Sequence, residues 1–319
     1  MRAASGEASD RPAALPALVA PEHVGETLLH AAPRLRALGE PLLRSAGAVL
    51  FRGFASAGRD DFSSFAASHG HALINYEFGS TPRTNKGGGV YSSTEYPAHQ
   101  HIPLHNEQSY SQQWPMKIWF YAERVAQSGG ETPIADSRAI YRRMPSAITR
   151  RFERDGVLYV RNFGNGLDVP WWQTFETEDR SAVEEVCRRR GIACEWKADG
   201  ELRTRERGQG VARHPRTLDW VWFNQAHLFH VSALPNEARE ALLACVEPED
   251  LPRNAYYGDG TEIEASVLEE IRGVLSEQEV VFPWQAGDVL MLDNMLTAHA
   301  RRPFLGLRSV SVAMAEPHR

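Results

Sequence analysis

The sequence predicts a mainly β protein with helical decoration, of the closed double-sheet type called a jelly roll. Strand-like apolar runs occur near residues 47–54 and 117–136 and again at the end of the chain. The stretch near 137–280, between the second run and the end, is largely helical in pattern. No internal repeat or low-complexity linker divides the chain. We therefore expect residues 21–319 to form one domain with a helical insertion near 137–280, preceded by a disordered tail over 1–20 that is rich in Ala, Pro and Ser.

The individual elements follow from local patterns. Helices are predicted where apolar residues recur about every 3.6 positions, and strands where a β-prone run is bracketed by glycine or another turn former. In chain order the patterns predict a helix over 25–45, a buried strand over 47–54, a helix over 59–70, a mobile glycine- and proline-rich loop over 79–90, a hairpin of strands 117–122 and 131–136 turning through Ser128-Gly129-Gly130, helices over 137–155, 180–193 and 233–247, and strands at the end of the chain.

Composition limits the kinds of partner and compartment. With 319 residues and 42% hydrophobic content the chain can bury a full core. A formal net charge of -6 gives no reason to expect a nucleic acid or an anionic membrane as partner. The three cysteines are scattered without CxxC spacing, and neither an apolar leader nor a run of 18 apolar residues occurs. We therefore expect a reduced, cytoplasmic protein.

The most informative chemical feature is His105-Asn106-Glu107 taken together with His299. Two imidazoles and one carboxylate form the ligand set of a facial non-haem iron(II) site, which leaves three coordination positions open. In an extended segment Glu107 projects to the same face as His105, and His299 must then come from another strand. A His-x-Glu pattern alone is also compatible with two unrelated surface side chains.

Other histidines compete for a ligand role. The pairs His69/His71 and His99/His101 each place two imidazoles on one face of an extended segment, and His227/His230 do so on a helix. None has a third ligand at a convincing spacing, so we interpret them as mostly structural. His101 lies four residues before His105 and could enter the surroundings of the metal or the substrate pocket.

An arginine follows in the last predicted strand. Arg308 falls on the same face as Val310, Val312 and Met314, and a guanidinium on an apolar face costs free energy unless it meets an anion. Two interpretations are open: a salt bridge with a protein carboxylate at the rim, or a bidentate clamp for a carboxylate ligand near the metal. Thr132, just after the glycine turn, could add a hydroxyl hydrogen bond to the same anion.

Four blocks of sequence resemble a known family. GAVLFRGF, PLHNEQSYS, SGGETPIADSR and GDVLMLDNMLTAHARRPFLGLRSVSVAM, in this order over about residues 45–315, are similar to the TauD/TfdA family of iron(II)/2-oxoglutarate-dependent dioxygenases. The strings STEYP, WPMKIWFY and VWFNQAHLFHVS resemble its syringomycin-type branch, whose members hydroxylate amino acids in natural-product assembly. The resemblance implies a double-stranded β-helix, iron held by His105, Glu107 and His299, and 2-oxoglutarate chelating the iron with its distal carboxylate on Arg308 and Thr132.

The chain also departs from that family. Many relatives of the clavaminate-synthase type have a longer connection between the last histidine and the arginine, which here are nine residues apart. Many carry a second arginine where this chain has Val312. Arg301 and Arg302 lie so close to His299 that we expect both in a loop rather than in the anion clamp.

The resemblance implies hydroxylation of an unactivated C–H bond, with O2 and 2-oxoglutarate consumed and succinate and carbon dioxide formed. Related halogenases lack the carboxylate ligand and place a halide there, so Glu107 favours hydroxylation over chlorination. The expected substrate is an amino acid in secondary metabolism, free or bound to a carrier protein and oxidised at its β-carbon. Desaturation or cyclisation could use the same site.

Residues near the predicted iron ligands are candidates for substrate binding. They are Arg83, Thr94, Glu95, Asn106 and Gln108. Two rival interpretations have different chemistry. One is a cupin-type metal enzyme using His99, His101, Glu107 and a later histidine without 2-oxoglutarate, although the cupin glycine and proline spacings are missing. The other is a non-catalytic binding protein that keeps the fold.

Overall fold

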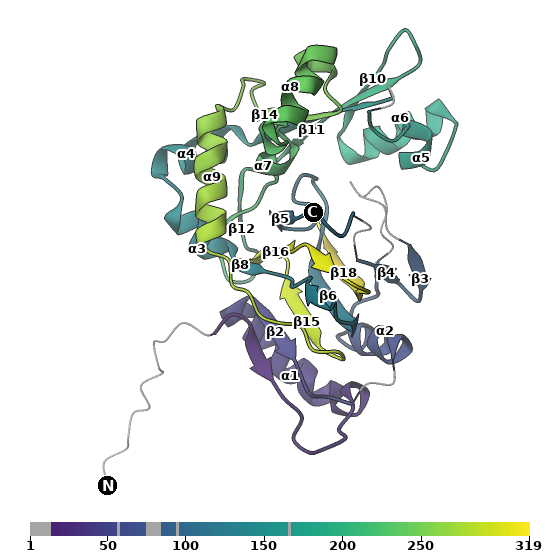
Figure 1. Cartoon of the computed structure of the whole chain (residues 1–319), viewed down its shortest axis with the longest axis vertical. Helices are drawn as coiled ribbons and strands as arrows, with labels where there is room; N and C mark the ends of the chain where they lie inside the picture. Colours follow the sequence, from purple (N-terminus) through teal and green to yellow (C-terminus); the bar gives the residue numbers. More distant parts are fainter. Residues whose placement is uncertain (1–13, 56–57, 75–83, 94–95, 165–166) are drawn as a thin grey trace.

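The computed structural model describes residues 14–55, 58–74, 84–93, 96–164 and 167–319. Two β-sheets form the centre of the molecule, two helices cover one side, and a lobe of helices and strands occupies the opposite end (Figure 1). This arrangement confirms the predicted mainly β fold with helical decoration. Within the described residues, no helix combines the length and the apolar character that crossing a membrane requires.

The larger central sheet has seven strands, and its strands alternate between two apolar faces. One face carries Leu50, Ile118 and Val312, which pack with Ile134 from the smaller sheet, so this face lies in the core between the sheets. The order of strands is β1 (Ala17–Val19), β2 (Ala48–Phe51), β15 (Val289–Asp293), β6 (Trp114–Arg124), β18 (Ser309–His318), β4 (Val90–Ser92) and β3 (Asn85–Gly87).

Two helices cover the other face of this sheet. α1 (Leu28–Ala46) and α2 (Arg59–Ala67) bury Leu35 and Phe65 against Phe51 and Trp119. The Thr27 hydroxyl caps the start of α1 by accepting a hydrogen bond from the amide of His30, and Gly47 ends the helix in a left-handed conformation. The helices predicted over 25–45 and 59–70 are thus confirmed.

The smaller central sheet supplies the candidate metal ligands. It consists of β5 (Ile102–His105), β16 (Thr297–Arg301) and β8 (Ile134–Asp136), with β16 in the middle. A short pair, β7 (Ser128–Gly129) and β17 (Phe304–Leu305), lies near its end. Along β16, Ala298 and Ala300 face the inserted lobe, so His299 between them points toward the larger sheet and contacts the Phe120 ring.

The lobe opposite α1 is built from the long insertion. A four-stranded sheet lies within it, in the order β10 (Ala193–Trp196), β11 (Leu202–Gly208), β9 (Val157–Phe163) and β14 (Arg253–Tyr257), and a separate pair joins β12 (Val211–Arg213) to β13 (Trp220–Trp222). The helices are α3 (Ser137–Arg143), α4 (Ser146–Asp155), α5 (Trp171–Thr174), α6 (Arg180–Arg190), α7 (Ala226–Phe229), α8 (Asn236–Cys245) and α9 (Ala265–Glu277), with 3-10 turns at Val231–Ala233 and Pro248–Asp250.

Several local predictions were wrong. The insertion is not purely helical, because its four-stranded sheet and the β12–β13 pair carry part of its core. The predicted 137–155 helix is two helices, since Met144 precedes Pro145 and is held in an extended conformation. The disordered tail does not extend to Ala17–Val19, which pair in parallel with β2.

The predicted hairpin between 117–122 and 131–136 does not form either. β6 pairs with β15 and β18 in the larger sheet, whereas β8 pairs with β16 in the smaller one. The glycine turn therefore carries the chain from one sheet to the other, as a jelly roll requires. Part of the predicted mobile loop over 79–90 lies outside the described residues, and Asn85–Gly87 within it forms β3.

Candidate active site

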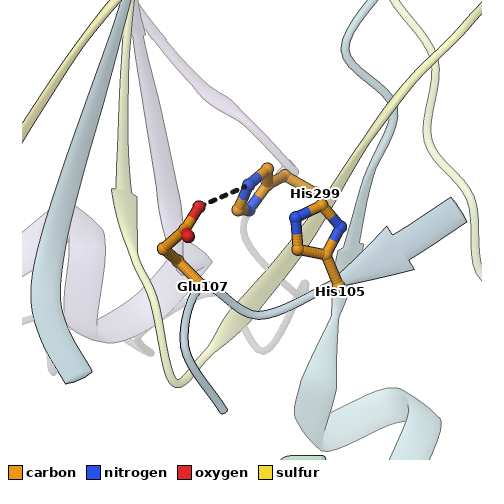
Figure 2. A group of neighbouring side chains, drawn as sticks. All are labelled: His105, Glu107 and His299. Atoms are coloured by element: carbon orange, nitrogen blue, oxygen red, sulfur yellow. Dashed lines mark ion pairs between the residues drawn. The ribbon is translucent and has the colours of Figure 1, made fainter. Parts of the chain in front are cut away.

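His105, Glu107 and His299 come together at the edge of the space between the two sheets (Figure 2). One ligand atom from each side chain lies within 4.8 Å of the other two. The carboxylate Oε2 of Glu107 is 3.9 Å from Nε2 of His299, and the two imidazole ring centroids are 4.4 Å apart. Glu107 and His299 are buried and His105 is half-buried, so the three donors converge on a point with a solvent-facing side.

The strands explain this convergence. His105 is the last residue of β5 and stands directly opposite His299 of β16 in an antiparallel register. Side chains at opposed positions project to the same face of a sheet, so both imidazoles point the same way. Glu107 lies two residues beyond the strand end, in the turn that follows. The expected meeting of His105 and Glu107 with a histidine from another strand is confirmed, but Glu107 reaches the site from a turn and not from an extended segment.

Asn294 fixes the backbone at Glu107. Its Oδ1 accepts a hydrogen bond from the Glu107 amide at 2.8 Å, and its Nδ2 donates to the carbonyls of Glu107 at 2.9 Å and Pro115 at 2.8 Å. Asn294 is fully buried, in the turn between β15 and β16. One side chain therefore links the carboxylate-bearing segment to the hairpin that carries His299.

Asn106 has a structural position rather than the substrate contact that we expected. It is buried, and its Nδ2 donates to Ser137 Oγ at 3.0 Å and to the Asn294 carbonyl at 2.6 Å. Its own carbonyl accepts from Gln225 Nε2 at 2.8 Å. These contacts hold the turn between His105 and Glu107 from behind.

The donor set fits a divalent iron ion. Nδ1 of His105 lies 2.9 Å from the carbonyl of Pro103, a contact that favours the tautomer with the proton on Nδ1 and the lone pair on Nε2. Two imidazoles and one carboxylate on one side of a point match the facial triad of non-haem iron(II) enzymes. His105, Glu107 and His299 could therefore hold the metal and leave the opposite side open.

A pocket opens directly beside the two histidines and ends at Arg308. It is lined by Ser93, Ile102, His105, Phe120, Thr132, His299, Ala300, Arg301 and Arg308. The predicted metal ligands and both predicted anion-binding residues thus share one cavity. Such a cavity can hold a small molecule whose one end reaches the metal and whose other end carries a negative charge.

Arg308 presents a buried positive charge to this pocket. Its Nε donates to the Gly130 carbonyl at 2.9 Å and its Nη1 to Ser93 Oγ at 3.4 Å, and no carboxylate of the described residues lies within ion-pair distance. Burial, together with the nearby charge of Arg301, lowers the pKa of Arg308 to about 10, so the charged guanidinium would gain free energy from an anion bound beside it. Of the two interpretations of Arg308, the carboxylate clamp fits and the rim salt bridge does not.

Gly130 and Thr132 complete that end of the pocket. Gly130 has φ +76°, and a Cβ added there would lie 2.9 Å from Cδ of Arg308, so the arginine can lie against the turn only because residue 130 is glycine. Thr132 is buried, and its hydroxyl accepts a hydrogen bond from Trp284 Nε1 at 3.1 Å. That bond leaves the hydroxyl proton of Thr132 to donate to an anion.

Arg301 corrects another expectation. It belongs to β16 rather than to a loop, and it is buried. Its guanidinium donates to the carbonyls of Tyr96 at 2.9 Å, Pro97 at 2.7 Å and Gln100 at 3.0 Å. It therefore adds positive charge beside Arg308 and holds the segment that leads into β5. Arg302, outside the strand, pairs with Glu279 at 2.8 Å.

A second pocket begins one residue after Glu107. Gln108, a predicted substrate residue, lines it together with Tyr110, Ser111, Tyr159, Arg161, Phe163, Thr174, Phe175, Val186, Arg190, Ile192, Thr204, Glu206 and Phe229. Most of these residues belong to the inserted lobe, which the sequence patterns did not connect with the site. The other predicted substrate residues, Arg83, Thr94 and Glu95, lie outside the described residues.

The remaining histidines do not gather into a second metal site among the described residues. His69 is buried with Nδ1 3.1 Å from the Phe65 carbonyl. His227 is buried with Nε2 2.9 Å from the Leu104 carbonyl, and burial lowers its pKa to about 3. His101 is exposed and lines neither pocket described above.

Comparisons with known proteins show the family of the chain. The family described as "Taurine catabolism dioxygenase TauD, TfdA family" matches residues 13–314. The dapdiamide synthesis protein DdaC of Enterobacter agglomerans is 43% identical over 278 residues, which are 87% of this chain and 84% of DdaC. A clavaminate synthase-like protein of Arabidopsis thaliana is 33% identical over 288 residues, which are 87% of this chain and 84% of that protein.

Solved structures show the same fold. PvcB of Pseudomonas aeruginosa superposes with a TM-score of 0.56 at 16% identity, over 98% of this chain and 95% of PvcB. A second PvcB structure, described as an Fe, alpha-ketoglutarate dependent oxygenase from an isonitrile synthetic pathway, gives a TM-score of 0.55. The match over nearly the whole chain, the 43% identical relative and the His-Glu-His cluster lead to one conclusion. The chain belongs to the TauD/TfdA family and is a dioxygenase that uses iron(II), 2-oxoglutarate and O2.

Proposed function

We propose that this dioxygenase hydroxylates an unactivated C–H bond, at the β-carbon, of an amino acid in natural-product biosynthesis. The assignment of residues rests on one observation: His105, His299, Thr132 and Arg308 line one pocket, and Glu107 lies beside it within ligand distance of the histidines. In this proposal His105, Glu107 and His299 hold the iron. Arg308 and Thr132 bind the distal carboxylate of 2-oxoglutarate.

Each residue has a defined task. Arg308 supplies a charge that burial leaves poorly solvated, so it gains from pairing with a carboxylate. Thr132, oriented by Trp284, donates a hydroxyl proton to the same group. Phe120 packs 5.0 Å from the His299 ring and excludes water from that side of the site.

With iron and 2-oxoglutarate bound, the site would use O2 as the oxidant: one oxygen atom would enter succinate as 2-oxoglutarate loses carbon dioxide, and the other would convert the substrate C–H into C–OH. Glu107 supports hydroxylation in particular. A carboxylate in this position occupies the coordination site that related halogenases leave to a halide. The residues of the second pocket would then position the carbon that reacts.

The names of similar proteins support a role in natural-product biosynthesis. DdaC is named as a dapdiamide synthesis protein, and PvcB is described as an oxygenase of an isonitrile synthetic pathway. An amino acid, free or loaded on a carrier protein, is the substrate class that the resemblance of the sequence suggests. The inserted lobe provides the pocket in which such a substrate would lie.

The test is succinate release across a panel of free and carrier-loaded amino acids, with iron, 2-oxoglutarate and O2 present. We expect at least one member to raise succinate formation above the rate without substrate, and mass spectrometry to find that substrate heavier by one oxygen atom. The variant His299→Ala serves as the inactive control. If no member of the panel exceeds the background rate of the wild-type enzyme, the amino-acid proposal fails.

A further inference from the structure

The second pocket carries two opposite charges on one sheet face. In the inserted sheet, β9 and β11 pair antiparallel with Arg161 opposite Thr204 and Tyr159 opposite Glu206. Strand alternation therefore places Arg161 and Glu206 on the same face as diagonal neighbours, whose backbones are about 7–8 Å apart. All four residues line the pocket.

The carboxylate of Glu206 is buried without full compensation. Its Oε1 is inaccessible to solvent and has no hydrogen-bond partner among the described residues. Burial raises the pKa of Glu206 to about 7, while hydrogen bonds from Ser111 and the Gln112 amide and the charge of Arg190 act in the opposite direction. A buried carboxyl group in this state gains free energy when a cation binds beside it.

Arg161 has the complementary excess of charge. It shares one carboxylate, Asp168, with Arg253, at N–O distances of 3.1 Å and 3.3 Å respectively. Two guanidinium groups on one carboxylate leave a net positive charge. Arg161 uses Nε and Nη2 for Asp168, and its Nη1 donates no hydrogen bond to any described residue. Arg161 and Glu206 do not form an ion pair with each other, so each can bind a separate group.

The two pockets are lined by residues on either side of Glu107 in the sequence. His105 lines the Arg308 pocket, Gln108 lines the second pocket, and Glu107 lies between them. Gln108 has φ +55°, an uncommon conformation for a residue with a side chain and one that often marks a functional constraint. Aromatic rings form one wall of this pocket: the ring centroid of Phe229 is 5.2 Å from that of Tyr110 and 5.0 Å from that of Tyr159, the residue opposite Glu206.

We propose that Glu206 binds the ammonium group and Arg161 the carboxylate group of a free amino acid, whose remainder extends along the aromatic wall toward Glu107. This inference rests on the proposed function and narrows it. A carrier-bound aminoacyl thioester has no free α-carboxylate, so it would leave Arg161 without its ligand. A zwitterion can pair with both charged side chains at once, whereas a simple acid or a simple amine can pair with only one of them.

Binding should also displace protons from Glu206. The titratable or charged groups that face this carboxylate are Arg190 and Cys187 of α6 and Tyr159 of β9. Of these, burial keeps the thiol and the phenol protonated near neutral pH, since it raises the pKa of both. Near pH 7 a part of the Glu206 population is protonated, and an ammonium ligand would favour the ionised form. The released protons can be counted by calorimetry in buffers of different ionisation enthalpy.

The test uses the full chain loaded with iron(II) and 2-oxoglutarate under argon, so that binding is measured without turnover. Calorimetry with the twenty common L-amino acids identifies the tightest ligand, and its amide and its α-hydroxy acid then serve as matched probes. We expect each analogue to bind roughly tenfold to hundredfold more weakly than the amino acid. Glu206→Gln should weaken the binding of the amino acid by a similar factor and abolish the proton release. The affinity for the α-hydroxy acid should stay nearly unchanged.

The matched control is Glu195→Gln, which removes a half-exposed carboxylate from the neighbouring strand of the same sheet and should change nothing. Arg161→Gln should weaken the binding of the amino acid but not the binding of its amide. Because this substitution also removes a partner of Asp168, the role of Arg161 is decided by comparing the amino acid with its amide on the wild-type protein. Circular dichroism establishes that each variant is folded.

The inference is overturned if no amino acid binds or if the amide binds as tightly as the amino acid itself. It is also overturned if Glu206→Gln binds the amino acid with wild-type affinity. Succinate assays separate this outcome from failure of the proposed function. Succinate release with a carrier-loaded substrate only would support the proposed function and contradict the binding of a free amino acid by Glu206 and Arg161. Tight, Glu206-dependent binding without any succinate release would do the reverse.

Discussion

His105 and His299 stand directly opposite each other in neighbouring antiparallel strands, with their ring centroids 4.4 Å apart. The metal site therefore depends on the register between β5 and β16. A slip of one residue would turn His299 to the face now occupied by Ala298 and Ala300, against the inserted lobe. The contacts that set this register are as important for the site as the ligands themselves.

Asn294 links the segment that follows β5 to the turn that precedes β16. Asn294→Ala removes three hydrogen bonds to backbone groups that stay buried, so we expect a loss of about 2–4 kcal/mol in the free energy of unfolding. Because Glu107 loses its anchor, iron affinity should also fall, by roughly tenfold or more. Urea unfolding and iron titration measure the two effects. The exposed Asn236→Ala is the control, and an Asn294→Ala protein with wild-type iron affinity would contradict the assigned role.

Arg308 should govern the affinity for 2-oxoglutarate. Arg308→Gln removes a charge-assisted contact to the distal carboxylate, and we expect the KM for 2-oxoglutarate to rise roughly tenfold to hundredfold. The KM of Arg308→Lys should lie between those of the wild type and Arg308→Gln, because lysine keeps the positive charge but cannot make two parallel hydrogen bonds to a carboxylate. Arg302→Gln, which removes a half-exposed arginine paired with Glu279, should leave KM unchanged. Equal KM values for all three variants would place the 2-oxoglutarate elsewhere.

A side chain at residue 130 should weaken the binding of 2-oxoglutarate by steric contact with Arg308. Gly130→Ala introduces a methyl group 2.9 Å from Cδ of Arg308 and should displace the guanidinium, which raises the KM for 2-oxoglutarate. The backbone cost of alanine at positive φ is controlled by Gly25→Ala, where φ is +82° and no atom lies within 4 Å of the added methyl. Gly25→Ala should lose only the backbone contribution to the free energy of unfolding, and Gly130→Ala should lose more because its methyl group also meets Arg308 and Phe304. Only Gly130→Ala is expected to weaken 2-oxoglutarate binding.

Glu206 should make the stability of the protein depend on pH. The folded-state pKa of about 7 lies above the ordinary value of 4.5, so the associated stability is fully present below about pH 4.5 and is lost as the pH rises through 7. Between about pH 5 and pH 8 the free energy of unfolding of the wild type should fall by roughly 2.5 kcal/mol more than that of Glu206→Gln, which cannot ionise. Urea unfolding at the two pH values measures this difference. Parallel curves for the two proteins would show that Glu206 is well solvated or paired.

The sequence predicted the parts of the site that depend on local patterns. His105 and Glu107 share a short segment, and Arg308 follows His299 by only nine residues, at the start of the last predicted strand. The glycine turn before Thr132 marked the end of the pocket, where Gly130 now contacts Arg308. These features need only strand alternation and the spacing of residues along the chain.

Features that depend on long-range pairing could not be predicted in this way. Asn294 reaches Glu107 across 187 residues, and nothing in its own neighbourhood indicates that partner. Arg161 and Glu206 become neighbours only through the register of β9 and β11, in a region predicted to be helical. The predicted hairpin failed for the same reason, because local patterns cannot tell which of two sheets a strand joins.

The central claim is that His105, Glu107 and His299 hold iron to which 2-oxoglutarate binds. Its most direct test is the visible absorption of the protein with iron(II) and 2-oxoglutarate in the absence of oxygen. We predict a weak charge-transfer band for the wild type and for His101→Ala, whose exposed imidazole lies four residues before the site, and no band for His299→Ala. A band of wild-type strength in His299→Ala would contradict the assignment.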